Sequence, residues 1–208
     1  MTRAEFRKRL DQLQEVITRG LTYYAVWKNL RLHDEGKVSW SLEEQNQVLG
    51  RFRGFFTPVG FALLDMTLMQ FAKVFDTDPR TASLSNLLRA ARQDTSLVSG
   101  RTSAEVDAVS RQFRQSRKML TALKRMRDQQ LAHLDADPEP VESLRNTDFD
   151  DLVEHVVSAF NGLSTAHDGR VINWEQSLRR VERDTSQILD MCIEQLRRQR
   201  AIAEDTRS

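Results

Sequence analysis

Apolar residues recur every three or four positions along most of this chain of 208 residues, and no segment shows the alternation typical of a strand. The first series of this kind extends over residues 3–32. Eight glycines and four prolines are few for this length, which favours long helices joined by few tight turns. The sequence therefore predicts an all-α protein, an up-and-down helical bundle of about five helices.

The same periodicity and its end signals place the remaining helices. Ser41-Leu42-Glu43-Glu44 is a capping box, in which the serine and the second glutamate satisfy free amides at a helix start. That helix extends to Phe75, and Thr57-Pro58 either kinks it or restarts it. Further helices are predicted over residues 85–92, 104–132, 148–166 and 173–203. Residues 1–208 are expected to form a single domain with a frayed tail over 203–208.

Composition limits where such a protein can act. The formal net charge of +1 gives no overall attraction to nucleic acid, so a basic surface would have to be local. A single cysteine excludes an internal disulfide and suits a reducing compartment. The most apolar stretch, 55–75, is not expected to span a membrane, because it is interrupted by Pro58, Asp65, Gln70 and Lys73. The N-terminus is too charged for a signal peptide, and these features together predict a soluble cytoplasmic protein.

Two polar residues occupy apolar series near the end of the predicted helix 104–132. The first series has a seven-residue step and consists of Phe113, Leu120, Arg127 and Leu134. The second has the same step and consists of Met119, Met126 and His133. A charged guanidinium on a core-facing line is costly unless it is paired or borders a wet cleft. The sequence therefore predicts that a polar group is held at the inner edge of the bundle, beside Arg127 and His133.

The helix that carries Arg127 is strongly basic. Residues 104–132 contain seven basic residues, at positions 111, 114, 117, 118, 124, 125 and 127, against Glu105, Asp107 and Asp128. Such a surface can be an ordinary solvated face beside an apolar stripe. Next to Arg127 and His133 it is expected instead to follow the phosphates of RNA. RNA contacts are predicted for four of these cations, Arg117, Lys118, Lys124 and Arg125.

The spacing of five residues between Arg127 and His133, with the polar Asp128 directly after the arginine, resembles the R-x(4–6)-H signature of HEPN domains. Two flanking stretches are similar to the Abi-U-type (abortive infection) branch of that family. They are Leu131-Ala132-His133-Leu134-Asp135 and Phe71-Ala72-Lys73-Val74-Phe75-Asp76. The resemblance covers most of the chain in helix order.

The resemblance implies an HEPN-like fold and a metal-independent endoribonuclease that acts as a toxin or phage-defence effector. It implies that His133 handles the proton of the ribose 2′-hydroxyl, that Arg127 stabilises phosphate charge, and that Asp128 supports them. It further implies a homodimer whose protomers face each other across the site, with an antitoxin or a defence protein as a further partner. Neither a cofactor nor a metal is expected.

Other interpretations of these residues stay open. His133 can be an ordinary residue at a helix end, where a cation is favoured. The chain can also be a catalytically silent HEPN bundle that binds a partner protein or a nucleotide, or a purely structural helical module. His133 with Asp135 and Asp137 has poor geometry for a metal. Glu154-His155 and His167-Asp168 are interpreted as ordinary surface pairs.

Overall fold

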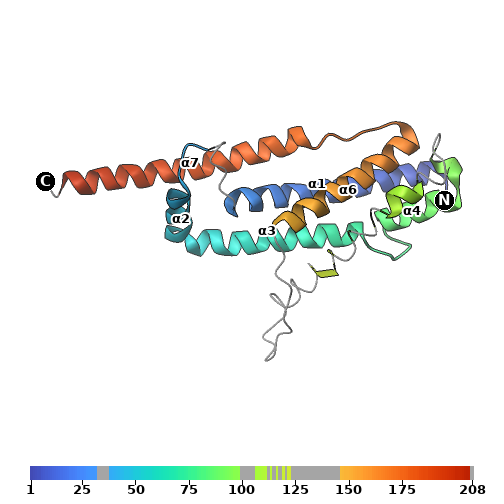
Figure 1. Cartoon of the computed structure of the whole chain (residues 1–208), viewed down its shortest axis with the longest axis horizontal. Coiled ribbons are helices and arrows are strands. Elements are labelled where there is room, and N and C mark those ends of the chain that lie inside the picture. Colours follow the sequence, from blue (N-terminus) through green and yellow to red (C-terminus); the bar gives the residue numbers. More distant parts are fainter. Residues whose placement is uncertain are drawn as a thin grey trace, which may run out of the picture. The chain divides into compact units, whose positions relative to one another are not determined.

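The computed structural model of the chain (Figure 1) describes residues 1–31, 38–98, 106–111, 113, 116, 119, 121–122 and 146–206. These residues form α-helices and one short 3₁₀-helix, and none of them lies in a strand. The predicted all-α class is confirmed. The helices are somewhat more numerous than predicted, in part because the helix predicted from residue 42 to residue 75 is divided in two.

The chain forms two compact units. Unit 1 consists of Met1–Leu21 and Met66–Asn173, and unit 2 consists of Thr22–Asp65 and Trp174–Ser208. Helix α1 (Arg3–Arg31) and helix α3 (Arg53–Val74) each contribute residues to both units. The single domain expected over residues 1–208 stays a prediction.

Unit 1 contains the first part of α1, the last part of α3, α4 (Leu84–Gln93), the 3₁₀-helix η1 (Thr95–Leu97) and α6 (Asn146–Asp168). Its core has large side chains that are almost completely buried, namely Phe6, Leu10, Leu13, Ile17, Leu21, Leu68, Phe71, Leu84, Leu87, Leu97 and Phe160. The members from α1 recur at the predicted spacing of three and four, because that spacing aligns side chains on one face of a helix. The predicted apolar face of the first helix is therefore confirmed.

Unit 2 contains α2 (Leu42–Arg51), the last part of α1, the first part of α3 and α7 (Glu175–Asp205). Its buried centre is a small cluster of Leu30, Trp40, Val48, Leu189 and Ile193. Partly buried residues surround this cluster, namely Val26, Val38, Leu49, Phe56, Val59, Leu63, Cys192 and Leu196. Unit 2 thus buries fewer large side chains completely than unit 1 does.

The boundary between α2 and α3 lies at Phe52, five residues before Thr57 of the expected break at Thr57-Pro58. The amide of Phe52 donates to the carbonyl of Val48 at 3.0 Å, while its own carbonyl accepts from the amide of Phe56 at 3.0 Å. Pro58 lies inside α3. A proline there removes the amide that would bond to the carbonyl of Gly54, and both residues are exposed, so water can solvate that carbonyl. The proline is therefore tolerated within the helix.

Several helix ends follow the predicted chemistry. The capping box of α2 is confirmed, because Ser41 Oγ accepts from the amide of Glu44 at 3.2 Å and Glu44 Oε2 accepts from the amide of Ser41 at 2.9 Å. Helix α6 ends before Gly169, which has a φ of 79°. This left-handed conformation favours glycine directly after a helix. Helix α7 extends to Asp205, which places the first residues of the predicted tail in the helix.

Helix α3 is long and apolar enough to cross a membrane, as judged by length and composition alone. A core helix of a soluble protein meets the same test. Two polar side chains of α3, Thr67 and Gln70, are buried within unit 1. The prediction that this segment does not span a membrane stays a prediction.

Candidate functional site

The predicted catalytic and RNA-contacting residues lie outside the described part of the chain. They are Arg127, Asp128 and His133, with Arg117, Lys118, Lys124 and Arg125. The structure does describe most of residues 106–122 in the preceding half of the same predicted helix, and these residues are helical. The helical prediction is therefore confirmed over this half. The site can be built only from this helical segment and the elements that contact it.

One face of segment 106–122 is buried in unit 1. Val106, Ser110, Phe113 and Ser116 form this face, at spacings of three and four. Val106 and Phe113 are separated by the seven-residue step that was used to predict the apolar series. The predicted burial of Phe113 is confirmed, and in the sequence the series continues with Leu120 and Arg127.

Aromatic and ionic contacts hold this segment against α3 and α4. The ring of Phe113 stacks on that of Phe75, directly after α3, with ring centroids 4.4 Å apart and planes at 8°. Arg92 of α4 contacts the carboxylate of Asp107 at 2.5 Å. The aromatic pair is buried, so it contributes more to positioning than the partly exposed ion pair does.

The segment also lies very close to α6. A Cβ atom built on Gly162 would lie 3.3 Å from a methyl group of Val109, so the missing side chain allows the close approach. Two turns earlier in α6, His155 Nδ1 lies 2.8 Å from Ser116 Oγ, within hydrogen-bond distance. Because Ser116 is only 1% exposed, it cannot meet a substrate as a nucleophile. The Ser116–His155 pair therefore positions the segment instead of reacting.

His155 is thus not the ordinary surface residue that was predicted. It directly follows the charged Glu154 in the sequence, which made it resemble a solvated position. The one local signal for its partner was Ser116, which follows Phe113 by three residues and so shares the face that Phe113 buries. The contact itself joins residues 39 apart in sequence, beyond the reach of local patterns.

The interpretation of His167-Asp168 as a surface pair is also wrong for the histidine. His167 is 3% exposed and packs against the ring of Phe6, with ring centroids 4.9 Å apart. Its Nδ1 lies 2.6 Å from the carbonyl oxygen of Leu97. A carbonyl can only accept, so Nδ1 carries the proton. This histidine fastens η1 to α6 and has a structural role.

Asp168 belongs to a network of ion pairs on the surface of unit 1. Its carboxylate contacts Arg7 of α1 and lies 3.1 Å from Arg170. Arg170 also contacts Asp11 of α1 at 3.1 Å. This network joins the first turns of α1 to the end of α6. Alternating charges at a helix terminus explain it without a catalytic role.

The displaced pKa values of carboxyl groups belong to helix ends and loops. A hydrogen bond from the Arg80 side chain lowers the pKa of Asp78, and the Ser96 hydroxyl lowers the pKa of Asp94 at the cap of η1. A strongly displaced pKa can mark a catalytic group. Here each displacement has a local structural partner. Within the described ranges, no three His, Cys, Asp or Glu side chains come together as metal ligands.

Comparison with known proteins agrees with this helical architecture. Residues 3–187 match the family model HEPN_AbiU2, which describes the AbiU2 proteins. No curated protein matches the chain, and no solved structure matches it either. The family match covers nearly all of the described helices and includes the positions of Arg127 and His133. The chain therefore belongs to the AbiU2 family of HEPN domains, a family of the abortive-infection type.

Proposed function

We propose that this protein is a metal-independent endoribonuclease that acts as a toxin or phage-defence effector. The observation that carries the proposal is the Arg127-x5-His133 motif within the segment that matches the family. Arginine and histidine suit RNA cleavage without a metal, because one stabilises phosphate charge and the other transfers protons near neutral pH.

In the proposed reaction, His133 takes the proton of a ribose 2′-hydroxyl, and the 2′-oxygen attacks the adjacent phosphorus. The bond from phosphorus to the 5′-oxygen breaks, and the leaving oxygen takes up a proton. Arg127 stabilises the charge that develops on the phosphate, and Asp128 offsets the positive charge of Arg127 in the free protein. Arg117, Lys118, Lys124 and Arg125 contact the RNA backbone on either side of the cleaved bond.

The proposed site requires a firmly held helix, since misplacement by about 1 Å can lower a rate by about 100-fold. The preceding half of that helix has the required contacts. Two contacts fix the rotation of this half about its axis and its position along that axis. They are the stacking of Phe113 on Phe75, next to α3, and the hydrogen bond between Ser116 and His155 of α6. These contacts support the proposal by supplying a fixed base for the motif.

The first experiment measures cleavage of unmodified RNA by the purified protein in excess EDTA. We expect cleavage that leaves 2′,3′-cyclic phosphate or 3′-phosphate ends together with 5′-hydroxyl ends. His133→Ala should reduce the rate by at least about 100-fold. Strict dependence on Mg²⁺, or products with 5′-phosphate ends, would rule out this mechanism. Absence of cleavage under all conditions would favour the catalytically silent bundle.

A second experiment separates a catalytic Arg127 from a structural one. Arg127→Ala should abolish cleavage while the melting temperature stays within a few degrees of the wild-type value. A buried structural arginine would behave differently, because its removal strands a charged partner and costs about 3–5 kcal/mol. A large fall in melting temperature would therefore contradict the proposed role.

The proposed site lies at a two-fold seam, where two copies of Arg127 can act on one phosphate. Specific activity should then fall when the protein is diluted below its dimer dissociation constant. A charged residue at Met126 should weaken association and cleavage together while the protomer stays folded. If sedimentation shows a monomer and that monomer cleaves RNA at the full rate, the site does not lie at a two-fold seam.

A further inference from the structure

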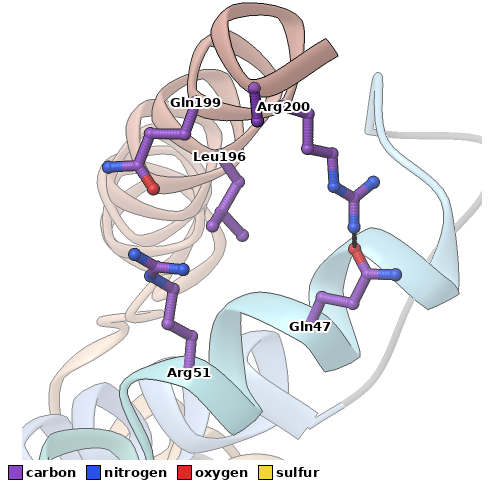
Figure 2. Close-up of a pocket in the computed structure, with 6 residues that line it drawn as sticks. Gln47, Arg51, Leu196, Gln199 and Arg200 are labelled. Atoms are coloured by element: carbon purple, nitrogen blue, oxygen red, sulfur yellow. Dashed lines mark hydrogen bonds between the residues drawn. The ribbon is translucent and has the colours of Figure 1, made fainter. Parts of the chain in front are cut away.

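A cleft lies between α2 and α7 in unit 2 (Figure 2). It has a volume of about 300 Å³ and is lined by Gln47, Arg51, Leu196, Gln199, Arg200 and Ala203. This volume is at the lower end of the range for small-molecule sites, and fits one nucleotide-sized group better than a large ligand. Arg51 and Gln199 lie on one side of the cleft, and Gln47 and Arg200 on the other, with Leu196 between them.

The two arginines of the cleft differ from their neighbours on α7. Arg197 is paired with Glu44 at 2.7 Å, and Arg198 contacts Glu194 at 3.4 Å. Arg200 instead donates to the neutral amide oxygen of Gln47. Neither Arg51 nor Arg200 forms an ion pair with a carboxylate of the described residues.

Gln47 connects Arg200 to the acidic side of α2. Its amide nitrogen donates to Glu43 Oε1 at 2.9 Å, while its amide oxygen accepts from Arg200. The amide thus orients the guanidinium of Arg200 without neutralising its charge. An arginine held in this way is prepared for an anionic ligand, because less side-chain freedom is lost on binding.

Exposed aromatic rings follow Arg51 in the sequence. Phe52 is 43% exposed and Phe55 is 62% exposed, and Arg53 lies between them. The ring of Phe55 meets that of Phe56 edge to face, with centroids 5.2 Å apart, and Phe56 packs against the core cluster of unit 2. Phe55 is therefore supported from one side and open to solvent on another, as a stacking platform for a base requires.

We propose that this part of unit 2 binds single-stranded RNA. Arg51 and Arg200 would hold backbone phosphates in the cleft, and Phe52 and Phe55 would stack on adjacent bases. An acidic peptide could use the arginines, but it would leave the exposed rings without a role. The choice of RNA rests on the proposed ribonuclease function, to which this surface would add a substrate contact outside the Arg127–His133 motif.

The first test measures binding of a labelled oligouridine of about twelve nucleotides in EDTA by fluorescence anisotropy. Its 2′-hydroxyls are methylated, so that it cannot be cleaved by attack of the 2′-oxygen. We expect Arg51→Glu combined with Arg200→Glu to weaken binding at least tenfold. The slope of log K against log salt should become shallower by about 1.4, the value for two lost phosphate contacts on a single strand.

The matched control is Arg180→Glu combined with Arg183→Glu, which makes the same change in net charge on exposed positions of α7. It should change the affinity less than about twofold at physiological salt, where the Debye length is about 8 Å. An equal loss of affinity in the two double variants would overturn the assignment of RNA binding to the cleft, because net charge alone would then explain binding. Arg51→Gln with Arg200→Gln replaces the charge reversal if the first double variant does not fold.

A second set of variants tests the stacking of bases on the exposed rings. It compares the RNA affinity of Phe52→Ala and Phe55→Ala with that of Phe61→Ala. Phe61 is 46% exposed on the same helix as Phe55 but lies about 120° around the axis from it. We expect each of the first two changes to weaken binding at least about fivefold with an unaltered salt slope, and Phe61→Ala to have no effect. Equal affinities of all three variants would overturn the assignment of bases to these rings.

Failure of this inference can be distinguished from failure of the proposed function. Suppose that wild-type protein binds the methylated oligonucleotide through the cleft but cleaves no unmodified RNA. This result would support the inference and contradict the proposed ribonuclease activity. Cleavage by the Arg51→Glu and Arg200→Glu double variant at the wild-type rate and with the wild-type KM would overturn the inference alone. Displacement of the RNA by an oligoglutamate at an equal charge concentration would also overturn it, in favour of an acidic protein partner.

Discussion

Unit 1 and unit 2 use their large apolar residues differently. Each of the largest fully buried side chains of the described chain belongs to unit 1, Phe6, Phe71 and Phe160 among them. Most of the large apolar residues that are exposed belong to unit 2, namely Leu42, Phe52, Phe55, Phe61, Ile188, Met191 and Ile202.

The two units therefore suit different tasks. Dense burial resists deformation, so unit 1 is suited to hold a helix whose side chains must be placed accurately. Exposed apolar residues beside arginines are typical of surfaces that bind a partner or a ligand. The comparison predicts that substitutions in unit 1 mainly change stability, whereas matched substitutions in unit 2 mainly change binding.

The largest expected effect compares two phenylalanines of helix α3. Phe71 is 0% exposed in unit 1, and Phe71→Ala should lower the free energy of unfolding by about 3–5 kcal/mol because it leaves a cavity. Phe55→Ala in unit 2 should lower it by less than about 1 kcal/mol, since most of that ring is already in water. Urea unfolding of the two variants measures the difference. Similar losses would contradict the division of roles between the units.

Two glycines within helices sharpen the comparison. A Cβ atom on Gly20 would lie 3.2 Å from both Gln70 Cβ and a ring carbon of Phe71, so Gly20→Val should destabilise unit 1 by about 1–3 kcal/mol. At Gly60 of unit 2 a Cβ atom meets none of the described atoms within 4 Å. Gly60→Ala should raise stability by about 0.5–1 kcal/mol through helix propensity. Thermal unfolding should show shifts of opposite sign, and a stabilising Gly20→Val would contradict close packing there.

Two serine caps provide a smaller contrast. Ser83 is buried in unit 1, where its hydroxyl accepts from the amide of Asn86 at 3.2 Å and donates to the carbonyl of Asp76 at 2.6 Å. Ser83→Ala should cost about 2 kcal/mol, because it removes a cap and leaves that carbonyl without its donor. Ser41→Ala, at the exposed cap of unit 2, should cost about 1 kcal/mol or less. Equal losses, measured by urea unfolding, would show that burial of the cap is unimportant.

Local patterns predicted much of the fold. The spacing of Phe6, Leu10 and Leu13 identified a buried helix face, and Ser41 with Glu44 identified a helix start. Both signals act within one or two helical turns, so the sequence alone displays them. The break at Phe52 was missed, because it was expected at Thr57-Pro58 and the isolated Gly50 and Gly54 were not interpreted as a helix end.

The candidate sites were less predictable because they depend on distant partners. The burial of Phe113 followed from periodicity, whereas His167 meets a carbonyl 70 residues away. The cleft of unit 2 brings together Gln47 and Arg200, which are 153 residues apart. No local spacing connects such residues. The catalytic role of Arg127 and His133 stays a prediction from the motif and its family.

The smallest expected effect concerns pH and belongs to unit 2. Hydrogen bonds from Arg197, at 2.7 and 3.0 Å, and from the amide of Ser41 lower the pKa of Glu44 from 4.5 to about 2. Because this pKa is lower in the folded chain, the unfolded chain takes up the proton first on acidification. The contribution of the pair is fully present above about pH 4.5 and is lost as the pH falls towards 2.

Wild-type protein should therefore lose stability more steeply between pH 4.5 and pH 2 than Glu44→Gln, which keeps a residue suited to the capping box but cannot titrate. Arg197→Met should flatten the same part of the profile, because it removes the largest cause of the displaced pKa. The effect should be modest, since both side chains are partly exposed and solvent screens their attraction. Urea midpoints measured at several pH values in this window test the prediction. Parallel profiles for wild type and both variants would show that the ion pair does not stabilise the contact between α2 and α7.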